Sequence, residues 1–362
     1  MRYEGMRYDI AALLLAWWDE GHADLPWRGG GDPYAIWVSE IMLQQTQIST
    51  VVPYFARWMT RFPTVAALAD APLGEVLKAW EGLGYYSRAR HLHAAAQKVA
   101  REMDGRLPQT AAALRQLPGI GPYTAGAIAS IAFDEAAPVL DGNVIRVLTR
   151  LFDLSDDVTR TETKKRLWAL AAELVPSRRP GDYNQALMEL GQTVCTGAKP
   201  DCARCPLRPH CLAAAQGTQL ERPVRPPRKN TPHYDVVAGI IWRDHHHFLI
   251  TQRPLDGLLG GLWEFPGGKC EPGESHAQAL RREIREELAL DITIGSHQTT
   301  IKHAYTHFRI TLHAYHATYH GGQPRHLGVA DHAWVTLDQL APYAFAATDR
   351  QIIDSLRQNS EN

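Results

Sequence analysis

The chain has 362 residues, more than one typical domain and enough for two or three. Hydrophobic residues make up 45% and charged residues 21%, which is ordinary for a globular protein. The net charge of −1 excludes nucleic-acid recognition by bulk charge, so such a partner would have to meet a local basic face. No apolar run has transmembrane length and the N-terminus lacks a secretory h-region, so we expect a soluble, intracellular protein.

The first 216 residues are predicted to form an all-α domain. Apolar residues recur there at spacings of three and four, with glycine and proline between the periodic stretches, including 29–31 and Pro53. Helices are predicted over residues 10–18, 38–42, 65–68, 76–80, 92–99, 125–131 and 167–174.

A glycine-rich loop, Leu117–Gly126, separates two of these helical stretches. Gly119 and Gly121 allow a sharp turn that exposes backbone N–H groups, and the next helix adds the positive end of its dipole. The loop can therefore hold a nucleic-acid phosphate without a charged side chain. A tight turn between packed helices is the plainer interpretation of the two glycines alone.

Four of the five cysteines lie within seventeen residues, in the pattern C-x6-C-x2-C-x5-C. Four thiolates so close together can hold one zinc ion or one iron–sulfur cluster, whereas disulfides have little support in such a chain. The uneven spacing favours a four-iron cluster and leaves zinc open. The four residues are Cys195, Cys202, Cys205 and Cys211.

Residues 217–233 are rich in proline and basic side chains and are predicted to form a stiff, extended linker. After it, a separate α/β domain is expected over residues 234–362. Strands are predicted over 234–242, 248–252, 292–294, 308–317 and 332–335, and helices over 275–288 and 348–356.

The loop at 117–126, the segment Val139–Arg146 and the spaced cysteines together resemble the endonuclease-III-like DNA glycosylases. Within that family, Ser39–Gln47 is similar to the signature of the adenine DNA glycosylases of the MutY type. The resemblance implies a helix–hairpin–helix domain and a [4Fe–4S] cluster on the four cysteines. It also implies a DNA substrate with adenine mispaired with 8-oxoguanine or guanine.

The same resemblance assigns the catalytic roles. Glu40 would be the general acid that protonates adenine N7, and its apolar helix would raise its pKa. Asp141 would stay ionised and stabilise an oxocarbenium-like sugar, as paired carboxylates do in glycoside hydrolysis. Capping of a helix is the alternative role for Asp141. Tyr123 and Asn143 would support the carboxylates. Tyr123 stands where bifunctional relatives have a Schiff-base lysine, so we expect a monofunctional enzyme.

Further positions carry binding roles by resemblance. Gln45 would wedge into the base stack, and Tyr85 would insert beside the opposing base while the adenine is flipped out. Gly119 and Gly121 would contact the backbone of the DNA. The positions that match the adenine pocket are Leu25, Trp27, Arg28 and Gln185.

The second domain fits the Nudix box from Gly268 to Leu290, except that Ala289 replaces a glycine. Glu283, Glu286 and Glu287 would fall near one another, within reach of a divalent ion. We expect lesion recognition without hydrolysis and therefore do not favour a Mg²⁺ requirement. Tyr305, Thr306 and His307 stand where the family's loop for recognising 8-oxoguanine usually has Phe-Ser-His, so the aromatic ring and the hydroxyl are preserved.

The sequence thus predicts a monomeric, DNA-associated adenine glycosylase of the bacterial cytoplasm, with no membrane partner. Three rival hypotheses are a bifunctional pyrimidine glycosylase and lyase, a nucleotide hydrolase tethered to DNA, and a DNA-damage-binding protein without activity. Tyr123 and the second domain argue against the first, and the presence of both Glu40 and Asp141 argues against the last.

Overall fold

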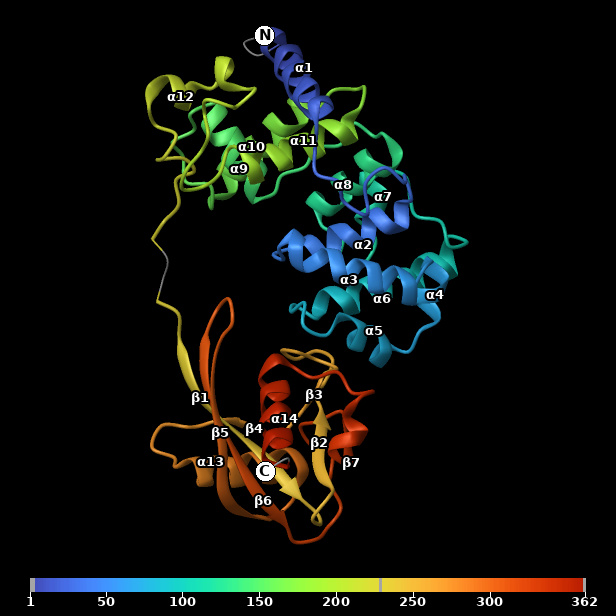
Figure 1. Cartoon of the computed structure of the whole chain (residues 1–362), viewed down its shortest axis with the longest axis vertical. Coiled ribbons are helices and arrows are strands. Elements are labelled where there is room, and N and C mark those ends of the chain that lie inside the picture. The colour runs from blue at the N-terminus through green and yellow to red at the C-terminus, as the bar shows by residue number, and fades with distance from the viewer. Residues whose placement is uncertain (1–3, 228–229, 361–362) are drawn as a thin grey trace. The chain divides into compact units, whose positions relative to one another are not determined.

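The computed structural model describes residues 4–227 and 230–360, and its contacts define two compact units (Figure 1). The first unit is Met1–Asp70 with His91–Arg228, and the second is Ala71–Arg90 with Lys229–Asn362. Arg228 and Lys229 of the predicted linker lie outside the described residues.

The regular elements of the first unit are helices, as predicted (Figure 1). No helix within the described ranges is both long and apolar enough to cross a membrane. The helices are α1 (Glu4–Glu20), α2 (Pro33–Leu43), α3 (Ile48–Arg61), α4 (Val65–Asp70), α6 (Ser87–Glu102), α7 (Ala111–Leu114), α8 (Pro122–Phe133), α9 (Gly142–Leu151), α10 (Thr161–Leu174), α11 (Pro180–Thr193), the 3-10 helix η1 (Arg208–His210) and α12 (Leu212–Gln216).

One core of the first unit joins α1, α9, α10 and α11. Ile10 and Leu14 lie one helical turn apart on α1, and Leu187 and Leu190 share one face of α11. Leu167 of α10 belongs to the same buried cluster. This core fixes α9 and α11, the two helices that carry Asp141, Asn143 and Gln185 at or near their ends.

Helix α3 corrects the prediction that Pro53 separates two elements, because Pro53 lies inside the helix. Val51, Phe55 and Trp58 are buried at a spacing of four and three residues, which gives α3 one apolar face. Pro53 is exposed, so the backbone carbonyl that loses its partner can be hydrated. Burial of the apolar face outweighs the cost of the proline.

The second unit contains a mixed seven-stranded sheet in the order β3-β2-β1-β6-β5, with β4 paired to β1 and β7 to β2. Only β1 and β6 run parallel among the named pairs of the described strands. The strands are β1 (His233–Trp242), β2 (Phe248–Gln252), β3 (Trp263–Glu264), β4 (Gly267–Lys269), β5 (Ile292–Ala304), β6 (Arg309–Tyr319) and β7 (Asp331–Val335).

Two helices, α13 (His276–Leu288) and α14 (Ala347–Ser360), cover opposite faces of this sheet. Val237 and Ile241 of β1 pack with the α13 residues, whereas Ala238 and Ile240 pack with the α14 residues. Alternate strand residues point to opposite faces, so one strand serves both cores. The 3-10 helix η2 (Leu337–Leu340) precedes α14. The predicted α/β class is therefore confirmed.

The segment 71–90, with α5 (Leu73–Trp80), belongs to the second unit although its sequence lies among the helices of the first. Lys78 Nζ donates to the Tyr343 carbonyl at 2.9 Å, and the Phe345 N–H donates to Glu81 Oε1 at 2.7 Å. Arg90 donates to the Gly260 carbonyl at 2.7 Å. The sequence pattern places this segment in the first domain, before the predicted linker at 217–233. Periodicity identifies a helix, but it does not show which hydrophobic core the helix joins.

Candidate active site

Glu40 lies on α2, which begins at Pro33 after Asp32 caps it by accepting from the Tyr34 N–H at 3.0 Å. The helix is buried along most of its length, and Glu40 is only 5% exposed. A carboxyl group in this position loses most of its hydration and needs partners from other elements.

Tyr123 supplies the partner of Glu40 from another helix. Its hydroxyl donates to Glu40 Oε2 at 2.9 Å and lies 3.2 Å from Met188 Sδ. Tyr123 is in the first turn of α8, directly after Pro122. The loop with the two glycines therefore leads directly into the helical turn that carries this hydroxyl.

Asp141 is the N-cap of α9, and it also faces the same cavity as Glu40. Its Oδ1 accepts from the Asn143 N–H at 2.9 Å and from the Val144 N–H at 2.7 Å, and its Oδ2 accepts from Asn143 Nδ2 at 2.9 Å. Asp141 can therefore cap α9 and belong to the candidate site at the same time. Three donors stabilise the ionised carboxylate.

The two carboxyl groups differ electrostatically. Burial raises the pKa of Glu40 to about 7; the hydrogen bond from Tyr123 opposes this rise, the charge of Asp141 adds to it, and Arg28 opposes it. Burial also raises the pKa of Asp141, against the hydrogen bonds from Val144 and Asn143. Glu40 can thus carry a proton near neutral pH, while Asp141 has the donors that an anion requires.

One cavity of about 770 Å³ brings these groups together. Nine of the residues singled out in the sequence line it: Leu25, Trp27, Arg28, Glu40, Gln45, Tyr123, Asp141, Asn143 and Gln185. Such a volume is sufficient for a nucleoside-sized ligand. Gln45 is exposed and has a left-handed backbone, with φ of 57°, which is costly for a residue with a side chain.

The cavity also contains residues that the sequence analysis did not identify. Glu189 is buried and pairs with Arg28 at 2.6 Å, and Arg28 Nε donates to Gln185 Oε1 at 3.2 Å. The pair holds the Gln185 amide in one orientation. Arg146 and Arg225 line the same cavity. Gln185 and Glu189 are one turn apart on α11, and this spacing beside a predicted pocket residue is the signal that could have identified Glu189.

The hairpin loop before α8 has the expected backbone. Gly119 has φ of 75°, and a Cβ there would lie 2.5 Å from His91 Cβ. Gly121 is exposed and is the N-cap of α8. Only glycine fits the turn at residue 119, and the loop presents its backbone at the start of a helix.

The four spaced cysteines line one small cavity and form no disulfide. Arg150, 2% exposed, contacts this cavity; its guanidinium lies 3.3 Å from Cys195 Sγ and donates to the Thr196 carbonyl at 2.6 Å. The four cysteines fit a cluster that thiolates hold. The buried guanidinium of Arg150 would offset the negative charge of such a cluster and its ligands. Their loop is tied to the candidate site by Arg146, which donates to Asn143 Oδ1 at 2.8 Å and to the Cys195 carbonyl at 2.7 Å.

Within the second unit, the Tyr85 hydroxyl and Thr306 Oγ1 are hydrogen-bonded. Tyr85 has φ of 48° and is 40% exposed. It lines a cavity of about 510 Å³ together with His303, Tyr305, Thr306 and His307. The predicted lesion residues and Tyr85 are therefore neighbours in one pocket.

The Nudix glutamates lie on α13, whose capping box is formed by Ser275 and Gln278. Arg282 pairs with Glu283 at 3.0 Å and with Glu286 at 3.2 Å, while burial raises the pKa of Glu287 to about 7. Among the described residues, the group of three metal-ligating side chains whose ligand atoms all approach within 4.8 Å is His326, Asp331 and His332. The three glutamates do not form such a group.

Family comparisons agree with both parts of this architecture. Residues 38–173 match the HhH-GPD superfamily of base excision DNA repair proteins, and residues 237–355 match the NUDIX domain. The fold and these two matches therefore define a helix–hairpin–helix DNA glycosylase domain followed by a Nudix-like domain.

The similar proteins narrow this class. Adenine DNA glycosylase of Rattus norvegicus is 39% identical, over 95% of this chain and 78% of that protein. Adenine DNA glycosylase of Homo sapiens is 38% identical, over 94% and 72% respectively. A thermostable thymine-DNA glycosylase structure is 29% identical, with a TM-score of 0.53, over 58% of this chain and 97% of that one. The chain belongs to the adenine DNA glycosylase family of base excision repair enzymes.

Proposed function

We propose that this glycosylase hydrolyses the N-glycosidic bond of adenine mispaired with 8-oxoguanine or guanine, and that it leaves the DNA strand intact. The observation that carries the proposal is the pairing of Glu40 with Asp141 in one cavity, one carboxyl group able to hold a proton and the other surrounded by donors.

Glu40 is the general acid of the proposal. Adenine leaves more readily when N7 is protonated, and a group with a pKa near the working pH is the best proton donor. Burial raises the pKa of Glu40 to about 7, and the Tyr123 hydroxyl fixes Oε2, so that the other oxygen can carry the proton.

Asp141 stabilises the positive sugar that forms as adenine leaves. Its three hydrogen bonds, from Asn143 and Val144, hold the carboxylate in place without solvent reorganisation. A water then adds its oxygen to the sugar carbon and gives one proton to the Glu40 carboxylate, which restores the acid.

The monofunctional outcome rests on the residues around the sugar position. Tyr123 has no amine to form a Schiff base, and lysine is absent from the described residues that line the cavity. Hydrolysis alone therefore leaves an abasic site that breaks only on treatment with alkali.

The flipped adenine occupies the first-unit cavity, where Gln185, oriented by Arg28, reads its edge. Gln45 fills the gap in the duplex; its strained backbone and exposed side chain suit an inserted group. Gly119 and Gly121 contact a backbone phosphate through their N–H groups.

The pocket of Tyr85, Tyr305, Thr306 and His307 recognises the base opposite adenine. The aromatic rings offer a stacking surface and the Thr306 hydroxyl a polar contact to the lesion. No divalent-ion chemistry is proposed for Glu283, Glu286 and Glu287, because Arg282 already pairs with two of them.

Cys195, Cys202, Cys205 and Cys211 would hold a [4Fe–4S] cluster, which would order the loop that carries Lys199, Arg204 and Arg208. Hydrolysis needs no redox step, so the role of these cysteines is structural. We also propose that the enzyme is a monomer and acts on DNA in the cytoplasm.

The test uses a labelled duplex with adenine opposite 8-oxoguanine, incubated with the full-length protein and divided before alkali treatment. We expect strand cleavage at adenine only after alkali, and no covalent complex after borohydride reduction. Cleavage without alkali would favour the bifunctional lyase, and hydrolysis of an oxidised nucleoside triphosphate to its monophosphate and pyrophosphate, without any adenine excision, would favour the nucleotide hydrolase.

A further inference from the structure

The polypeptide that leaves the first unit is bound to it rather than free. The Val158 N–H donates to the Val224 carbonyl at 3.1 Å, and Arg150 Nε donates to the Arg222 carbonyl at 3.2 Å. Arg222 Nε also pairs with Asp153 at 2.9 Å, with its side chain only 9% exposed. The part of the predicted linker at Arg222 and Val224 is therefore held against the helices of the first unit.

That path places Arg225 at the catalytic cavity. Arg225 lines the same cavity as Glu40 and Asp141, although it lies more than eighty residues after Asp141 in the chain. Its neighbour Val224 is held by Val158, so the backbone at this point cannot move far from the cavity. Arg225 itself is exposed.

The three arginines that line the cavity have different surroundings. Arg28 is committed to Glu189 and Gln185, and Arg146 to Asn143, Gly191 and Cys195. In the described part of the chain, no hydrogen bond or ion pair is formed by the Arg225 side chain. Its five donors are therefore free for a ligand.

The local charge favours an anion at this position. Arg225 shares this cavity with the guanidinium groups of Arg28 and Arg146. Guanidinium groups that repel one another are relieved by an anion between or beside them. The anion of a DNA substrate nearest to a flipped nucleoside is its own backbone phosphate.

We propose that Arg225 forms a phosphate-binding site at the mouth of the catalytic cavity and contacts the DNA backbone beside the flipped adenosine. The site rests on the proposed function, since it assumes that the substrate nucleoside enters this cavity. Arg225 is a binding and positioning residue; it transfers no proton and contacts no reacting atom. The linker thereby becomes part of the DNA-binding surface of the first unit.

The test measures binding of full-length protein to a fluorescent duplex over salt concentrations from about 50 to 200 mM, because each phosphate contact contributes a slope of about −0.9 in a plot of log K against log salt. In Arg225→Ala we expect a slope shallower by about 0.9 and affinity lower by roughly two- to fivefold. Arg225→Lys keeps a charge and should restore the slope.

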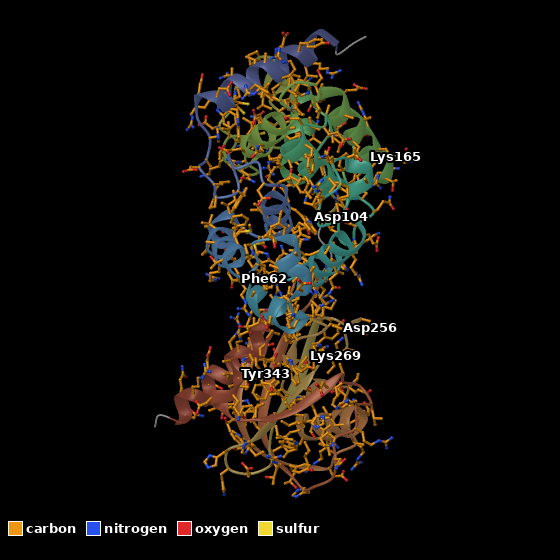
Figure 2. All side chains as sticks on the ribbon, turned by 90° about the vertical axis from the view of Figure 1, so that its right-hand side faces the viewer. Phe62, Asp104, Lys165, Asp256, Lys269 and Tyr343 are labelled. Carbon is orange, nitrogen blue, oxygen red and sulfur yellow. The ribbon has the colours of Figure 1, made fainter. Side chains whose placement is uncertain are left out.

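The matched control is Lys165→Ala, which removes one positive charge from α10, where Lys165 is 70% exposed on the outer side of the helical unit (Figure 2). Its slope should equal that of the parent. At saturating protein the single-turnover rate of this control should also equal that of the parent.

An unchanged slope in Arg225→Ala would overturn the proposal. A large fall in the saturated rate with the slope unchanged would show instead that Arg225 acts on the reacting groups, which also overturns it. The slope can be measured on an unreactive duplex, so a failure of adenine excision would contradict the proposed function and leave the phosphate contact separately tested.

Discussion

The Tyr123 hydroxyl lies 2.9 Å from Glu40 Oε2, and this hydrogen bond joins two helices that line the candidate active-site cavity. It favours the ionised form of Glu40 and so opposes the rise in pKa caused by burial. The pair therefore determines both the position of the proposed acid and the pH range in which it can donate a proton.

The excision rate should fall as the pH rises through about 7. Glu40 must be protonated to act, and its pKa is raised by burial to about 7. Single-turnover rates of adenine release, measured across this range with subsaturating protein, should trace an alkaline limb near that value. A rate that stays constant well above pH 7 would exclude Glu40 as the titrating acid.

Tyr123→Phe should shift the alkaline limb to higher pH. Loss of the hydroxyl removes the hydrogen bond that lowers the pKa of Glu40, so the acid stays protonated over a wider range. The measurement is the pH–rate profile of the variant beside Tyr8→Phe, a control whose side chain is 70% exposed on α1. A shift to lower pH, or an identical shift in the control, would contradict the assignment.

Glu40 should also make folding stability depend on pH. Because its pKa is raised above the ordinary value of 4.5, its contribution to stability is complete below that value and is lost as the pH rises towards about 7. Urea unfolding at several pH values should therefore show a smaller fall for Glu40→Gln than for the parent. Parallel curves for the two proteins would mean that Glu40 is not shifted.

The Tyr85–Thr306 hydrogen bond should contribute to discrimination at the opposing base. Tyr85→Phe and Thr306→Val each remove it, and each should reduce the preference for 8-oxoguanine over guanine by about fivefold, the worth of one net hydrogen bond. The double variant should lose little more than either single one, because both remove the same contact. The control is Tyr319→Phe, which lies in the same unit but outside the pocket and should leave the preference for 8-oxoguanine over guanine unchanged. Fully additive losses would show that the two side chains act separately.

Cys211→Ser should lose iron and stability, whereas Cys270→Ser should lose neither. Cys211 lines the cysteine cavity, and Cys270 lies in the second unit outside it. Iron analysis and thermal unfolding of the two purified variants make the comparison. Equal iron content in both would remove Cys211 from the proposed ligand set.

Much of the candidate site could be predicted from the sequence, because its members lie in short local motifs. Glu40, Gln45, Tyr123 and Asp141 lie within or beside such motifs, and the structure places all four in one cavity. The alternative cap role of Asp141 also proved correct as local structure, since one carboxylate both caps α9 and faces the cavity.

The other features of the site and the fold could not be predicted, because they depend on tertiary contacts that no local sequence pattern reveals. Glu189 looks like an ordinary helical glutamate until Arg28 is placed beside it. Arg225 lies in a proline-rich segment whose path is fixed by Val158 and Asp153, far away in sequence. Likewise, the helical pattern of residues 71–90 does not reveal that they pack with the second unit.

The most direct test of the central claim, that Glu40 protonates the leaving adenine, is the single-turnover rate of Glu40→Gln at saturating protein on a duplex with adenine opposite 8-oxoguanine. The glutamine keeps the shape and can still accept from Tyr123, but it has no proton to donate. We expect a rate at least about 100-fold below that of the parent, with duplex affinity little changed. A rate within about threefold of the parent would contradict the mechanism.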